Sequence, residues 1–280
     1  MPPCRPSAFL ESRRPALRDL VSRLAKRYDY VSILGTDDTG LSYRASPGET
    51  SAGEPMWVQR GFVLRAQREG RIVEKSFNLL EPRLDPAFLQ ALEADLEALL
   101  EAGKGGRSYP TLPDQAATGS YCGSLAIDPF DHDPEDCLKR LSALRDGLLA
   151  APEVVSAWAR AEFVTVCRTF LSPNRDLFQT FPWAQAHIFG VARRGEVSKL
   201  DYRPASGLLG LEILDRLEPE LPGLAAELGA LLDSTRIEPG EYEVILRPDM
   251  AGTLAHEAFG HGVELDMFVK ERAKAADFLG

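Results

Sequence analysis

The chain has 280 residues, 44% of them hydrophobic, and carries a formal net charge of −10 at pH 7. This length and composition fit a globular protein of one large domain or two, and the acidic balance argues against nucleic acid or an anionic membrane as the main partner. The sequence has no stretch of about 18 apolar residues and no apolar signal-peptide segment near its start. Its four cysteines show no paired spacing, which is typical of a reducing compartment. We therefore expect a soluble, cytoplasmic protein that binds neither nucleic acid nor a membrane.

The N-terminal third predicts two helices with short strands between them. The first helix is expected to open near Pro15, a residue favoured in a first turn, and its apolar stripe consists of Leu17, Leu20, Val21 and Leu24. Strands are predicted at residues 30–34, 41–44, 61–66 and 72–77. Residues 46–55 have the Gly- and Ser-rich composition of a loop. Asp85 is expected to cap a second helix to about Ala102, with an inward face formed by Phe88, Leu89, Leu92, Leu96 and Leu99.

The remaining chain predicts a long hairpin with helices on either side. Asp133 is expected to cap a helix that runs to about Ala150, so the neighbouring His132 and its acidic residues are interpreted as a helix start rather than a metal site. Long strands at residues 156–170 and 176–193 are joined by a turn. A helix over residues 206–232, broken at Pro219 and Pro222, is expected before a final strand and a last helix.

Within the predicted hairpin, one histidine and several aromatic residues have two possible roles. His187 lies in the middle of a strand and is interpreted as structural rather than as a ligand. Trp158, Phe181 and Trp183 would suit a peptide groove, but packing on the sheet is the preferred interpretation.

These elements predict an α+β fold with three regions. Residues 1–106 form a mixed helix and strand region, and residues 107–235 form a central region with the long hairpin and helices. Residues 236–280 are expected to begin a C-terminal metal-binding domain. No internal repeat is evident in the sequence.

The segment His256-Glu257-Ala258-Phe259-Gly260-His261 carries the clearest chemistry in the chain. Two imidazoles suit a borderline divalent ion, and an adjacent carboxylate can take a proton from an attacking water. His256 and His261 are therefore candidate metal ligands, and Glu257 is the candidate general base. The alternative is a helix end with two partly buried histidines and a solvated Glu257.

The spacing of the two histidines constrains the local backbone. Residues five apart on a straight α-helix differ by about 140° around the axis, so the two rings would diverge. They can share one ion only if the helix widens into a π turn or ends there. Gly260 and Gly262 ease either distortion. Asp249 is expected to cap the helix that leads into this segment.

Two imidazoles alone are fewer protein ligands than the three that catalytic zinc usually has. Glu264 follows His261 by three residues, so it can share a helix face with it, although a solvated surface role is preferred. Cys4, Cys122, Cys137 and Cys167 are widely spread and are interpreted as ordinary thiols.

The stretch Val244 to Asp266, with its signature H-E-A-x-G-H-x-x-E-x-D, resembles the metal-site helix of the TldD/PmbA metallopeptidases, specifically the TldD branch. The resemblance is closest over residues 237–280 and is weaker but collinear from about residue 160. It implies that His256 and His261 bind the metal, that Glu257 is the general base, and that a cysteine far downstream completes the site. It also implies unfolded or modified peptides as substrates, and a homodimer or a heterodimer with a PmbA-type subunit.

The expected function is thus metal-dependent peptide hydrolysis, with zinc as the favoured ion and iron as another option. Members of the family continue for well over a hundred residues beyond this helix, so we expect this chain to be part of a longer or split protein and to be inactive alone. The alternative from another class is a non-catalytic binding or assembly subunit that keeps a vestigial metal motif.

Overall fold

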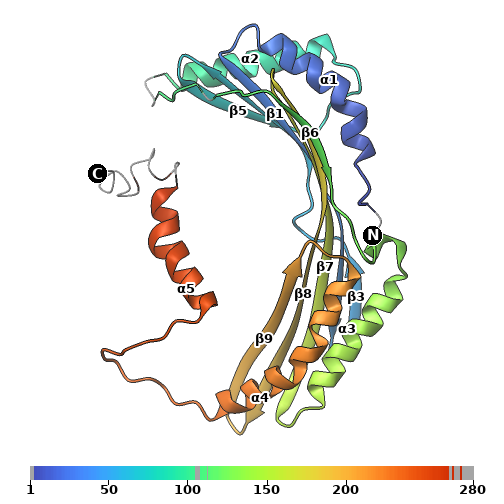
Figure 1. Cartoon of the computed structure of the whole chain (residues 1–280), viewed down its shortest axis with the longest axis vertical. Coiled ribbons are helices and arrows are strands. Elements are labelled where there is room, and N and C mark those ends of the chain that lie inside the picture. Colours follow the sequence, from blue (N-terminus) through green and yellow to red (C-terminus); the bar gives the residue numbers. More distant parts are fainter. Residues whose placement is uncertain (1–2, 105–107, 112, 265–266, 268–271, 273–280) are drawn as a thin grey trace. The chain divides into compact units, whose positions relative to one another are not determined.

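The structure is a computed structural model that describes residues 3–104, 108–111, 113–264, 267 and 272 (Figure 1). The chain divides into two compact units, residues 1–234 and residues 235–280. Helices and one large, mainly antiparallel sheet make up the first unit. The α+β prediction is therefore confirmed. In the described part of the chain, no helix is both long and apolar enough to cross a bilayer.

The sheet of the first unit contains nine strands within the residues that the structure describes. The strands are β1 Tyr30–Asp37, β2 Thr39–Ser46, β3 Glu49–Gly53, β4 Arg60–Arg68, β5 Arg71–Phe77, β6 Ala117–Cys122, β7 Val154–Leu171, β8 Arg175–Arg194 and β9 Val197–Gly207. One path through the sheet follows the order β3-β2-β7-β1-β4-β5, while β8 pairs with β7, β9 and β6. Only the β6–β8 pair among these is parallel.

The β7–β8 hairpin is formed by the two longest strands of this sheet. Its register is continuous from Ser156 opposite Val191 to Leu171 opposite Asp176. The other edge of β7 pairs with β2 and then with β1, so this one strand joins the N-terminal strands to the central ones. The long hairpin predicted from the sequence is confirmed, with each strand a few residues longer than expected.

Four helices cover one face of the sheet (Figure 1). They are α1 Ala8–Leu24, α2 Pro86–Ala102, α3 Pro134–Leu149 and α4 Leu221–Leu232. The core lies between them and the sheet in two clusters, one under α1 and α2 and the other under α3 and α4. Odd-numbered residues of β7, such as Phe163 and Cys167, belong to these clusters, because alternate strand residues point to one face.

The opposite face of the hairpin and β9 carries a row of aromatic rings. Trp158, Phe189 and Tyr202 are paired across β7, β8 and β9. Phe189 stacks on Trp158 with centroids 5.0 Å apart and on Tyr202 at 5.3 Å. His187 stacks on Phe189 at 5.7 Å. The pKa of this histidine is lowered mainly by burial and also by the charge of the nearby Arg160. The structural interpretation of His187 agrees with these contacts.

The N-terminal elements differ from the prediction in three places. The first helix begins at Ala8, because the buried Ser7 caps it through a hydrogen bond from the Leu10 N–H at 3.0 Å, and Pro15 lies inside the helix. Residues 46–55 are not only loop, because a Pro47-Gly48 turn folds β3 back onto β2, and Gly48 takes a φ of 75° there. On α2, Leu100 is buried in place of the predicted Leu99.

The central elements also differ from the prediction. The strands β6 and β9 are not anticipated from the sequence, and β9 ends at Gly207 inside the predicted helix. Two short 3₁₀ turns, Leu211–Arg216 and Glu218–Glu220, then precede α4. The predicted final strand is wrong, because residues 234–247, all of which the structure describes, contain no strand.

Candidate metal centre

The second unit presents the candidate site on a short helix, α5, which spans Pro248–Ala255. Arg247 is its N-cap residue, and the Ala251 N–H donates to the Arg247 carbonyl at 2.8 Å. The predicted cap, Asp249, lies instead in the first turn, where a carboxylate interacts favourably with the helix dipole. Pro248 takes the first helical position, because its missing N–H would have no partner there.

After Ala255 the helix widens into a π turn. Residues His256–Gly260 form this turn, and the N–H of His261 donates to the carbonyl of His256. A 3₁₀ turn over His261–Val263 follows and ends the helix. The local widening that the spacing of the histidines requires is therefore present, and it brings residue i+5 back toward residue i.

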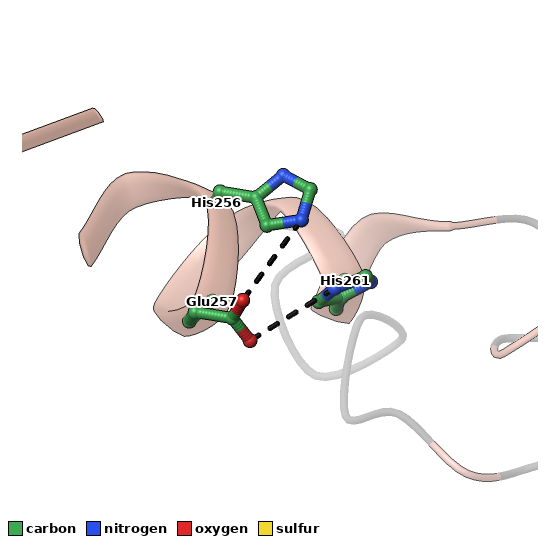
Figure 2. A group of neighbouring side chains, drawn as sticks. All are labelled: His256, Glu257 and His261. Atoms are coloured by element: carbon green, nitrogen blue, oxygen red, sulfur yellow. Dashed lines mark ion pairs between the residues drawn. The ribbon is translucent and has the colours of Figure 1, made fainter. Parts of the chain in front are cut away.

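The π turn brings the three predicted residues together (Figure 2). The ring centroids of His256 and His261 are 4.4 Å apart with an interplanar angle of 69°. Glu257 lies between them, with one carboxylate oxygen 4.0 Å from His256 Nε2 and the other 3.9 Å from His261 Nε2. One donor atom from each residue lies within 4.8 Å of the other two.

This donor set suits zinc chemically. Imidazole nitrogen and carboxylate oxygen are both common zinc ligands, and a catalytic site leaves one position for water. Two imidazoles still fall short of the usual three protein ligands when the carboxylate serves as a base.

The site is open to solvent. The side chains of His256 and Glu257 are 62% and 65% exposed, and α5 and the two turns after it bury no residue. Large apolar side chains of the same unit are exposed as well, including Ile245 at 99% and Phe259 at 64%. Exposed ligands bind an ion in competition with water, so these three residues alone predict weak affinity.

A fourth polar residue belongs to this group and was only partly anticipated from the sequence. Glu264 lies three residues after His261, and its Oε1 is 2.7 Å from His261 Nδ1. The ring of His261 therefore has one carboxylate on each nitrogen, Glu257 near Nε2 and Glu264 on Nδ1. The three-residue spacing is the sequence signal for this contact.

His132 and the buried cysteines have contacts that indicate structural roles. His132 Nδ1 lies 3.2 Å from the Asp128 carbonyl, beside the N-cap of α3, as the helix-start interpretation predicts. Burial raises the pKa of Cys4 to about 11 and that of Cys137 to about 12. Protonated thiols are poor metal ligands, which favours the interpretation of these cysteines as packing residues.

No family model matches the chain, and no curated protein matches it in sequence. Its fold, however, resembles solved structures. One is a protein from Thermotoga maritima described as a proposed modulator of DNA gyrase, with a TM-score of 0.58 and 12% identity over 83% of this chain and 50% of the other. A protein from Bacteroides thetaiotaomicron with the same description has a TM-score of 0.53 and 13% identity over 75% and 49%.

A third similar structure is TldE from Thermococcus kodakarensis, with a TM-score of 0.54 and 14% identity over 76% of this chain and 47% of the other. At these identities the likeness establishes a shared fold. The chain spans about half the length of the proteins that it matches.

Proposed function

We propose that this chain carries the ion-binding histidines and the general base of a TldD-type metallopeptidase. The observation that carries the proposal is the π turn, which places the donor atoms of His256, Glu257 and His261 within 4.8 Å of one another. The sequence signature around this turn and the fold shared with TldE support the same family.

In this proposal, His256 and His261 hold a divalent ion, with zinc favoured and iron as the other option. When bound, such an ion polarises the scissile carbonyl and makes a nearby water more acidic. Glu257 takes a proton from the attacking water as the water oxygen forms its bond to the carbonyl carbon. The same carboxyl group then gives the proton to the amine nitrogen as the C–N bond breaks.

The chain spans about half the length of the proteins that its fold resembles, so the rest of the activity is proposed for a complete protein. The family resemblance implies a third ligand, a cysteine, further along the complete protein. It also suggests unfolded or modified peptides as substrates, with assembly as a homodimer or with a PmbA-type partner. An exposed helix with two imidazoles supports this view, because catalytic zinc usually has three protein ligands in a water-poor cavity.

The experiment that tests the proposal is Glu257→Gln in the full-length protein. We expect hydrolysis of an unfolded peptide to fall by about 10²–10⁴-fold, because general-base catalysis is lost, while bound zinc stays at the wild-type level. Glu241→Gln, at an exposed position of the same unit, is the matched control and should keep full activity. Full activity of Glu257→Gln would refute the proposed mechanism.

Bound zinc also separates the peptidase from its alternative. A full-length protein that holds no divalent ion and cleaves no peptide would favour the non-catalytic binding or assembly subunit. Zinc together with Glu257-dependent cleavage would exclude that alternative.

A further inference from the structure

The contact between Glu264 and His261 determines which imidazole nitrogen of His261 is free. Oε1 of Glu264 lies 2.7 Å from Nδ1, a distance typical of a charge-assisted hydrogen bond. An ionised carboxylate can only accept hydrogen bonds, so Nδ1 must carry the proton. A neutral imidazole has one N–H only, which leaves Nε2 with a free lone pair.

That free nitrogen faces the candidate site. Nε2 of His261 is the atom that lies 3.9 Å from the carboxylate of Glu257, and its ring is 4.4 Å from that of His256. The carboxylate of Glu264 therefore lies on the far nitrogen of the ring, away from the point where the donor atoms converge. This arrangement is unsuited to a third metal ligand, which was one option for Glu264 from its spacing alone.

The backbone after the π turn creates the contact. The 3₁₀ turn over His261–Val263 is closed by the Glu264 N–H, which lies 3.5 Å from the His261 carbonyl. Glu264 then adopts φ −63° and ψ 130°, so the chain leaves the helix at this residue. The tight turn keeps Glu264 beside the ring, and both side chains remain 46% exposed.

We propose that Glu264 is a positioning residue that holds His261 in the tautomer and orientation needed to bind a metal through Nε2. This inference rests on the proposed function, because it assumes that His261 is a ligand. Histidine in water prefers its proton on Nε2, the nitrogen that faces the site. A carboxylate on Nδ1 reverses that preference and increases the basicity of the free nitrogen.

The first test measures the tautomer in metal-free protein. Side-chain ¹⁵N NMR of the whole chain should show the His261 proton on Nδ1. In Glu264→Ala the proton should move largely to Nε2. Glu264→Gln should keep it on Nδ1, because the amide oxygen still accepts a hydrogen bond. A wild-type His261 protonated on Nε2 would overturn the proposal.

The second test measures the zinc affinity of the full-length protein by competition with a chelator. Glu264→Ala should weaken zinc binding by about 10–100-fold, the usual effect of removing a carboxylate behind a histidine ligand, and Glu264→Gln should weaken it less. Glu243→Ala removes an exposed negative charge from the same unit and should leave affinity unchanged. Equal affinity in wild type and Glu264→Ala would overturn the role of Glu264 alone. A full-length wild-type protein that takes up no zinc would overturn the proposed function and the role of Glu264 together.

Discussion

At the scale of single residues, the two carboxylates beside His261 face different nitrogens, and we therefore propose different roles for them. Glu257 lies near Nε2 of His261 and also near Nε2 of His256, so it can act on a molecule bound beside these two nitrogens. Glu264 contacts Nδ1 of His261, and the distance from its Oε1 to that nitrogen is 2.7 Å. The residue types of the motif predict the first role directly, because acid next to histidine is the chemistry of metal hydrolases. The role of Glu264 depends on the 3₁₀ turn that ends the helix, and the spacing of residues in the sequence does not predict this turn.

His187 gives a prediction for the pH dependence of stability. Its pKa is lowered in the folded state, chiefly by burial and then by Arg160, while Glu162 acts in the opposite direction. The unfolded chain therefore binds a proton more readily between that lowered value and the ordinary value of about 6.5. The stability contributed by neutral His187 is complete above about pH 6.5 and is lost as the pH falls through the folded pKa.

We expect the free energy of unfolding, measured with urea, to fall more steeply between about pH 7.5 and pH 5 in the wild type than in His187→Gln. Glutamine does not titrate, so the difference between the two curves reports this histidine. Parallel curves over that range would contradict the proposed effect of burial.

At the scale of elements, local signals predict some parts of the fold and miss others for identifiable reasons. Asp85 and Asp133 each cap a helix through a hydrogen bond from the N–H two residues later, and both helices are predicted to within a residue or two. The strand β6 has every residue exposed and pairs with β8, more than fifty positions along the chain. Such a strand has no hydrophobic alternation to reveal it.

The helix predicted over residues 206–232 forms only in its last part, α4. Its first part is absent because the chain is held close to a distant segment at Gly210. The Leu211 N–H donates to the Ile127 carbonyl at 3.1 Å, and the carboxylate of Glu212 accepts from the Ile127 N–H at 3.2 Å. A β-carbon on Gly210 would lie 1.9 Å from the Ile127 carbonyl oxygen. Tertiary contacts of this kind override helical periodicity.

Two glycine substitutions with opposite expected effects test this close approach. Gly210→Ala should destabilise the protein by about 1–3 kcal/mol, because a backbone carbonyl must move. Gly229→Ala, within α4 and with open space around it, should stabilise it by about 0.5–1 kcal/mol through helix propensity. Urea unfolding of both variants is the measurement, and a Gly210→Ala protein as stable as the wild type would contradict the packing at this junction.

At the scale of the whole molecule, the first unit is well packed, whereas the described residues of the second unit, 235–264, 267 and 272, form no hydrophobic cluster. Both hydrophobic clusters lie within residues 1–234, whereas α5 and the turns after it bury no residue. The α+β class follows from sequence periodicity. The final strand predicted before α5 does not form, because a strand needs a hydrogen-bonding neighbour, and Val244 and Ile245 are 71% and 99% exposed.

The central claim is that His256 and His261 hold a divalent metal ion beside the general base Glu257. Its most direct test is the zinc content of the full-length protein after equilibrium dialysis against buffered zinc. The content is measured by mass spectrometry for the wild type and for a double variant, His256→Ala with His261→Ala. His132→Ala, which removes an imidazole at the start of α3, is the matched control. We predict that the wild type and His132→Ala bind zinc equally and that the double variant loses it. A double variant that retains the wild-type zinc content would contradict the account.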